Sequence, residues 1–589
     1  MKSLDDHDSR RMFSSRIFGS EDSCPTSFED VSNDILEKCG GIPLAIISIS
    51  SLLADQPKPT FEYVRKSLGS MFDGNPTLDQ MRQILELSFR NLPNHLKTCL
   101  LYLGTYPEDH KILWVDLLRQ WIAEGFVCAI PGLDAEDVAL SYFNELINRS
   151  MIQPVGTCVN GEVSSCRVHD IMLDVIRSKI EEDNFISLLN DPEVVLGMHR
   201  NIRRASLQCS GKECIVTSAM VNGSFSKVRS VYVFGGFSCQ SLMMLKYIRV
   251  LHLDIVRNDV LDLTGISRLF LLRYLRVVCG QRVELPSEIG KLQQLQTIDL
   301  RNYVSKLPSD IASLPRLLHL IVNKDTVFPD GIGRLRHVRI IAVFDLSKNS
   351  VENIEGLGEM FSLRDFKFQW SGKDLVEGAR RMELLRSSLE RISGSLMTLW
   401  MYPGGFKSGL LDGWSTFSSP PIHLREMWMN GCVFSTIPNW FGQLRDLQTL
   451  NFMVRGAGLK DDGFAILTGL PSLVYLDLCA TELVEERVHI PGSGMAFRAL
   501  KIFHFWCDHN VLLTFEAGAM PMLKKLHLSL EPSGCESPVD GVEHLPAGLR
   551  EVKLCICGER KEAVAFSLKI AFEEHHPSAS LEIATSYGM

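Results

Sequence analysis

Residues 447–478 read LQTLNFMVRGAGLKDDGFAILTGLPSLVYLDL, and the pattern that opens this stretch, LQTLNF, returns as LVYLDL at its end. Apolar side chains occupy the first, fourth and sixth places of both copies. Fourteen copies of the pattern follow one another at a mean step of about 25 residues, which is typical of a stacked repeat. The copies start at Val228, Ile248, Leu272, Leu295, Leu317, Val338, Leu363, Leu396, Leu424, Leu447, Leu473, Leu500, Leu523 and Leu549.

The alternation within each copy predicts one short strand with a buried face and an open face. Turns that begin near a proline and carry apolar residues at helical spacing, such as LPSEIGKL from Leu285, separate the strands. A single repeat cannot bury its apolar face alone, so the copies must stack. We therefore predict a leucine-rich-repeat solenoid over residues 191–589, with a parallel sheet on its concave face and an irregular convex side.

The middle open place of each strand predicts which side chains line the concave face. Trp400 and Trp428 hold this place in successive copies, so they should lie about 5 Å apart on neighbouring strands. Exposed tryptophans are typical of binding hot spots, and we predict partner contacts by Trp400, Trp428, Lys367 and Asn451. The alternative is that the long repeats around the tryptophans bring a loop over the face and bury both. The full row is Tyr232, His252, Arg276, Asp299, Ile321, Ala342, Lys367, Trp400, Trp428, Asn451, Asp477, His504, His527 and Lys553.

The chain has 589 residues, 45% of them apolar, and a net charge of -9, which is typical of a globular protein of two to four domains. The charge is uneven. Residues 1–200 carry 18 Lys and Arg against 30 Asp and Glu, and the remainder carries 43 against 40. This balance argues against a protein that coats nucleic acid or an anionic membrane.

Sixteen cysteines are scattered without a CxxC pair, which argues against a metal site or a disulfide scaffold and favours a reducing compartment. The longest apolar stretch, GIPLAIISISSLLA, is shorter than the roughly 20 residues that span a bilayer, and no signal-like core opens the chain. We predict a soluble cytoplasmic protein without a membrane span, with the nucleus or the plasma-membrane surface as further locations.

The first 190 residues change to helical periodicity. Trp114, Leu117 and Trp121 lie on one apolar stripe of a helix that ends near Gly125. A helix precedes this stripe, and residues 155–167 alternate like a hairpin before another helix, which together predict a winged-helix domain. Because residues 81–180 hold 9 Lys and Arg against 12 Asp and Glu, we do not expect this domain to bind nucleic acid.

Upstream, EKCGGIPLAI places two glycines between two apolar helices, with Pro43 in the first turn of the second. Paired glycines allow the backbone to approach a neighbouring group closely. A helix hairpin with a tight turn would explain this pattern without a ligand. In the same way, His169, at the start of the helix predicted after residues 155–167, is more often a buried core residue than a ligand.

KCGGIPLAI, then LSFRNLPNHLKTCLLYLGTYPED, then CRVHDIMLDVI, followed by the repeats, resembles the plant intracellular immune receptors of the nucleotide-binding, leucine-rich-repeat type, in their coiled-coil class. The resemblance covers nearly the whole chain and implies an α+β multidomain protein. Its parts would be a remnant of the nucleotide-binding domain (1–24), a helical ARC1 domain (25–78), a winged-helix or ARC2 domain (79–190) and the repeats (191–589).

The resemblance also implies nucleotide contacts. Pro43 would pack near the base, and His169 would reach the β-phosphate of ADP and hold the receptor shut. His169 lies at a predicted helix start, where backbone N–H groups favour an anion. The residue before it is Val168, where the family usually has Met. No G-x-x-x-x-G-K-[ST] phosphate loop occurs in the sequence, so we expect neither tight binding of ADP or ATP, the family's ligands, nor enzymatic activity.

The predicted function is that of an amino-terminally truncated innate immune receptor. Its repeats would recognise a pathogen effector or a guarded host protein, and its winged-helix part would restrain an ADP/ATP switch that triggers defence. A full-length immune receptor is a further predicted partner. The alternatives are a non-signalling scaffold or decoy, and an ATPase whose nucleotide loop lies upstream of this sequence.

Overall fold

A computed structural model describes residues 4–19, 24–54, 56–69, 78–159, 161–189, 202–215, 225–238, 245–255, 260–301, 304, 306–402, 407–459, 461–481, 486–492, 496–507, 511–531, 538–558 and 561–585. The chain divides into two compact units. Unit 1 comprises Met1–Asn258 and Arg268–Gly280, and unit 2 comprises Asp259–Ser267 and Gln281–Met589. The predicted domain boundary at residue 190 lies outside the described residues.

The first part of unit 1 is helical because each helix has a local start or stop signal. The Asp5 carboxylate caps α1 by accepting from the Asp8 amide at 2.7 Å. Gly40, at φ 58°, ends α2 in the left-handed region, and Pro43 opens α3. The helices are α1 (Asp6–Phe18), α2 (Thr26–Cys39), α3 (Pro43–Leu53), α4 (Lys58–Gly69) and α5 (Leu78–Arg90).

A winged-helix arrangement follows, as the sequence predicts. The hairpin of β2 and β3 is antiparallel, and β1 pairs with β3. Gly125, at φ 85°, ends α7, and Asp134 and Asp137 form a capping box at the start of α8. The elements are α6 (Asn94–Tyr102), β1 (Ile112–Leu113), α7 (Trp114–Glu124), α8 (Ala135–Asn148), β2 (Gln153–Thr157), β3 (Val163–Arg167) and α9 (Asp170–Glu182).

Unit 1 ends in the first repeats, whose strands pair in parallel and in the predicted register. Tyr232 lies opposite His252, and His252 lies opposite Arg276. The ladder runs through β4 (Ser187–Leu189), β5 (Arg204–Ile215), β6 (Ser230–Ser238), β7 (Val250–Ile255) and β9 (Tyr274–Cys279). Because β5 brings Ser206 opposite Tyr232, it adds one repeat that the sequence pattern missed.

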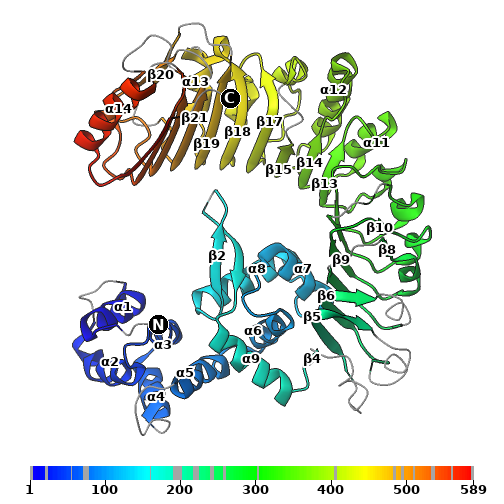
Figure 1. The fold of residues 1–589 in the computed structure, drawn as a ribbon, viewed down its shortest axis with the longest axis vertical. Coiled ribbons are helices and arrows are strands. Elements are labelled where there is room, and N and C mark those ends of the chain that lie inside the picture. Colours follow the sequence, from blue (N-terminus) through cyan, green and yellow to red (C-terminus); the bar gives the residue numbers. More distant parts are fainter. Residues whose placement is uncertain are drawn as a thin grey trace. The chain divides into compact units, whose positions relative to one another are not determined.

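Unit 2 is a longer parallel ladder of the same kind, with its strands side by side in Figure 1. Lys367, Trp400, Trp428 and Asn451 face one another across four strands, as predicted. The ladder comprises β11 (Thr297–Leu300), β12 (His319–Val322), β13 (Ile340–Asp345), β14 (Asp365–Gln369), β15 (Thr398–Met401), β16 (Lys407–Ser408), β17 (Glu426–Phe434), β18 (Thr449–Arg455), β19 (Tyr475–Thr481), β21 (Ile502–Cys507), β23 (Lys525–Leu530), β25 (Glu551–Ile556) and β26 (Ser580–Thr585).

The connections on the other side of this sheet are irregular, as predicted. Short 3-10 turns alternate with helices and with two small parallel sheets. The longest repeat inserts α12, which packs on α11 and on the neighbouring turns η8 and η9. These elements are β8 (Leu261–Asp262), β10 (Val283–Glu284), η7 (Ile332–Arg334), α11 (Val351–Gly356), η8 (Leu357–Glu359), α12 (Leu375–Arg391), η9 (Asp412–Ser415), α13 (Asp461–Thr468), β20 (Glu486–Ile490), β22 (Val511–Phe515), β24 (Val539–Asp540) and α14 (Lys561–His575).

The cysteines differ in one respect from the expectation of reduced thiols. Twelve cysteines of the described residues are free, whereas Cys209 on β5 is disulfide-bonded. The expectation that every cysteine is a free thiol is therefore wrong for Cys209.

Candidate functional site

Helix α7 of the winged helix contacts strands β7 and β9 of the first repeats, and it lies beside β9 in Figure 1. Its apolar stripe, with Leu117 and Trp121 fully buried, belongs to the core of the winged helix. Its polar residues Asp116, Gln120 and Glu124 recur every four places, and they too are buried. A helix that is buried on its polar face needs partners for that face.

The strands of the first repeats, together with Arg119 and Tyr106 of the winged helix, supply those partners. An Asp116 oxygen lies 2.6 Å from Arg276 Nη1, and its other oxygen lies 3.8 Å from Arg119. Gln120 is fully buried; it accepts from the Tyr106 hydroxyl at 2.9 Å and lies 3.4 Å from the Tyr274 hydroxyl. Carboxylate, amide and guanidinium groups therefore pair with one another out of water, which makes this α7 contact specific in geometry.

Glu124, at the end of α7, completes the α7 contact. One of its oxygens accepts from the Ser230 hydroxyl, and the other lies 3.1 Å from Arg204 Nε. The Arg204 guanidinium also sits 4.9 and 4.5 Å from the ring centres of Phe126 and Phe185. Arg204 is thus held by a charge and by two aromatic faces, which adds cation–π attraction to the ion pair.

The α7 contact corrects part of the predicted concave row. The sequence placed Tyr232, His252 and Arg276 at open positions, but Tyr232 is fully buried and His252 is 4% exposed. Burial lowers the pKa of His252 well below its usual value. The winged helix covers this part of the sheet, and no strand pattern predicts such a neighbour.

His169 and Pro43, the predicted nucleotide contacts, each open a helix. His169 caps α9, where Nδ1 accepts from the Ile171 amide at 3.4 Å, and its side chain is partly exposed. Both α3 and α9 pack on α5, and the residues beside the pair, Leu44 and Val168, belong to one apolar core. The Pro43 ring and the His169 imidazole would contact only part of a nucleotide, and the paired glycines before Pro43 form no cradle for its phosphates. A Cβ on Gly41 would lie 2.4 Å from the Leu4 carbonyl, so this backbone approaches Leu4 instead.

On unit 2 the rings at middle open places, together with Tyr402 and Tyr475 beside them, form a continuous series of ring contacts, which we call the aromatic row. Trp400 and Trp428 have ring centres 4.9 Å apart and nearly parallel planes, which agrees with the predicted spacing. Lys367 lies 4.7 Å from the Trp400 ring centre. Both tryptophans are partly exposed. The inserted α12 packs with the connections on the other side of the sheet. The side chains are therefore neither fully open nor fully buried, and both predicted alternatives are only partly correct. The row is Tyr402, Trp400, Trp428, Tyr475, His504 and His527.

A hydrogen-bonded group lies beside the aromatic row. Asn451 donates to Asp477 at 2.8 Å, and the Tyr475 hydroxyl contacts both Asp477 and His504, at 3.3 and 3.1 Å. Burial raises the pKa of Asp477, while burial and the stacked His527 lower the pKa of His504 to about 4. Asn451 is only 8% exposed, so the prediction that its side chain is open is wrong; close neighbours on a concave face cover the short side chain.

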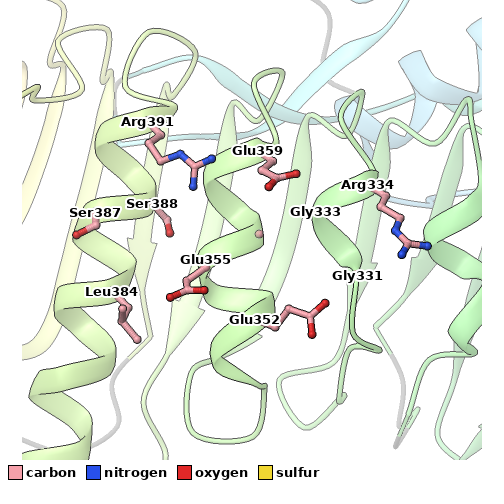
Figure 2. Close-up of a pocket in the computed structure, with 11 residues that line it drawn as sticks. Gly331, Gly333, Arg334, Glu352, Glu355, Glu359, Leu384, Ser387, Ser388 and Arg391 are labelled. Carbon is pink, nitrogen blue, oxygen red and sulfur yellow. The ribbon is translucent and has the colours of Figure 1, made fainter.

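A separate pocket of about 470 Å³ lies among the connections of unit 2 (Figure 2). Glu352, Glu355 and Glu359 project into it from α11 and η8, with Arg334 on one side and Arg391 on the other. Its walls meet closely because Gly333 lies against Gly356: a Cβ on Gly333 would be 2.7 Å from the Gly356 carbonyl oxygen. Charges of both signs line the pocket, so its electrostatics select neither an anion nor a cation.

Comparisons with known proteins agree with this architecture. A family model described as leucine-rich repeat region matches residues 227–579, and one described as disease resistance protein winged helix domain matches residues 105–176. The chain belongs to the leucine-rich-repeat disease resistance proteins.

Relatives of this chain include proteins of rice and tomato. It is 39% identical to disease resistance protein RGA5 of Oryza sativa subsp. japonica, over 92% of this chain and 50% of that protein. It is 29% identical to Pik-2 of the same plant, over 94% and 59% of the two chains. ToMV resistance protein Tm-2(GCR236) of Solanum lycopersicum is 30% identical over 90% and 62%. The chain thus spans about half the length of these relatives, and none of them is named for an enzymatic activity.

Among solved structures, the chain is similar to a leucine-rich-repeat protein of Leptospira interrogans, at 17% identity and a TM-score of 0.44, over 67% of this chain and 99% of that one. That likeness is too low to support any conclusion about function. Among the described residues, none of the helices has the length and apolar character to cross a bilayer.

Sequence reasoning missed the buried polar side of α7. Its apolar stripe is plain in the sequence, but Asp116, Gln120 and Glu124 look like an ordinary solvated face. Their four-residue spacing is a usable signal, because three polar residues on one helix face can meet three successive strands.

Proposed function

We propose that this chain is the sensing and restraining part of a plant immune receptor. The repeats bind a pathogen effector or a guarded host protein, and the winged helix restrains an ADP/ATP switch that starts the defence response. The observation that carries the restraining role is the α7 contact, in which buried charges tie the winged helix to the first repeats. A partner that competes for those strands would shift the population toward a released winged helix.

The aromatic row is the surface we assign to partner binding. Trp400, Trp428 and Lys367 combine large partly exposed rings with a cation, which are features of binding hot spots. Trp428 Nε1 and Asn451 Oδ1 are a buried donor and a buried acceptor without a hydrogen-bond partner in the described part of the chain. Such atoms favour a site that is completed by water or by another molecule.

The test of partner binding compares variants of the chain in proximity labelling in infected plant tissue. We expect Trp400→Ala with Trp428→Ala to lose a specific set of labelled proteins. The control is Phe566→Ala with Ile570→Ala on α14, where both side chains are exposed, at 67% and 49%, and it should keep that set. Identical labelling by all three proteins would contradict the assignment and favour the scaffold or decoy alternative.

The nucleotide part of the proposal is tested separately. Because His169 and Pro43 supply only part of a nucleotide site, we expect calorimetric titration of the purified chain with ADP or ATP to show no saturable binding below millimolar concentration. Micromolar affinity that Pro43→Ala and His169→Ala weaken would instead show that this chain holds the nucleotide by itself.

A further inference from the structure

One edge of the sheet in unit 2 is lined by basic residues. The residue directly before a strand is Arg or Lys in six of the repeats, and none of the twelve strands from β11 to β25 in the main ladder has an acidic residue there. Parallel strands all begin at the same edge, so these residues form one line, which we call the basic rim. Its members are Arg339, Arg364, Arg425, Lys501, Lys524 and Arg550.

Backbone hydrogen bonds show how closely the first members lie. The Arg364 amide donates to the Arg339 carbonyl at 2.8 Å, the Met397 amide to the Arg364 carbonyl at 2.8 Å, and the Arg425 amide to the Met397 carbonyl at 2.8 Å. Each step is therefore one strand spacing, about 4.8 Å. Three arginines fall within about 15 Å of rim, although the whole chain has a net charge of -9.

These three arginines line one pocket of about 500 Å³. Phe361, 59% exposed, lies in its wall, and Ile422, 45% exposed, precedes the lining residue His423. Asp446 is the single carboxylate among its described lining residues, and it lies 3.6 Å from His423. The pocket therefore joins exposed apolar surface to an excess of positive charge.

We infer that this pocket on the basic rim binds an acidic segment of a partner protein, which places an apolar side chain against Phe361 and carboxylates against the arginines. The charge selects an acidic partner. The exposed Phe361 and Ile422 select a protein segment over a nucleic acid, because a duplex backbone offers charge without an apolar side chain. Arginine suits carboxylates through paired N–H donors. This surface is separate from the aromatic row, so either assignment can fail alone.

The experiment measures fluorescence anisotropy of a labelled ten-residue peptide of glutamates with one central phenylalanine, titrated with the full chain at low and moderate salt. We expect Arg364→Glu with Arg425→Glu to weaken binding about tenfold, because two charges that line the pocket reverse, one half-buried and one exposed. Phe361→Ala should weaken it about threefold at both salt concentrations, because that contact is apolar. A peptide with serine in place of phenylalanine should match the Phe361→Ala result.

The matched control is Lys501→Glu with Lys524→Glu, which makes the same charge change on the same rim without the pocket. We expect less than a twofold effect, with circular dichroism spectra like the parent's for every variant. Equal losses for both charge-reversed pairs would overturn the inference, because binding would then follow net charge alone. Tighter binding of a labelled DNA duplex than of the peptide, or no effect of Phe361→Ala, would also overturn it.

Discussion

Replacement of Arg276 by alanine is the sharpest test of the α7 contact. The Arg276 and Asp116 side chains are 12% and 6% exposed, and their charged atoms lie 2.6 Å apart. At an effective dielectric constant near 20 their attraction is at most about 6 kcal/mol. Removal of one partner of a buried pair costs about 3–5 kcal/mol, because the other charge stays buried. Arg119 remains 3.8 Å from Asp116, so we expect the lower end, about 3 kcal/mol.

Hydrogen exchange measured by mass spectrometry reports the stability of α7 itself. A local measurement is needed because a chain with two units need not unfold in one step. A cost of about 3 kcal/mol should lower the protection of peptides covering α7 by about 150-fold. The control is Asp116→Leu with Arg276→Met, which removes both charges and should restore most of the protection. A loss below about fivefold for Arg276→Ala, or a double variant as unprotected as the single one, would refute the reasoning.

Three further outcomes are expected. Trp400→Ala and Trp428→Ala should each cost stability, and a double-mutant cycle measured by urea unfolding should return a coupling of about 1 kcal/mol from the stacked rings; additive costs would show that the stack contributes nothing. Burial holds the pKa of His504 at about 4, so the unfolded chain takes up the proton first as pH falls from about 6.5, and stability should fall down to about pH 4. His504→Asn should flatten that slope in melting temperature measured against pH, and an unchanged slope would exclude His504 as its source. Gly333→Ala should cost about 1–3 kcal/mol because its Cβ meets backbone, whereas Gly548→Ala, with nothing within 4 Å, should leave the melting temperature nearly unchanged.

Local chemistry explains why parts of the site were predictable. The left-handed Gly40 and the opening Pro43 act within a few residues of themselves, so their roles follow from the residue types. The spacing of Trp400 and Trp428 was equally predictable, because parallel strands in register repeat at a constant distance. The exposure of those rings was not predictable, because it depends on the side of the sheet on which the long repeat places its extra residues. In the structure those residues form α12, which packs with the connections.

The sequence by itself determined the stacked repeat, the register of its strands, the winged helix and the basic residue before many of the strands, because each of these depends on a period or a spacing along the chain. Only the tertiary structure decided that Asp116 meets Arg276, 160 residues later, and that Phe361 shares a pocket with three arginines, each of which directly precedes a different strand. A pattern of residues shows which side chains a segment presents. Burial and the removal of water, which make such a contact strong, depend on what packs against that segment from elsewhere in the chain.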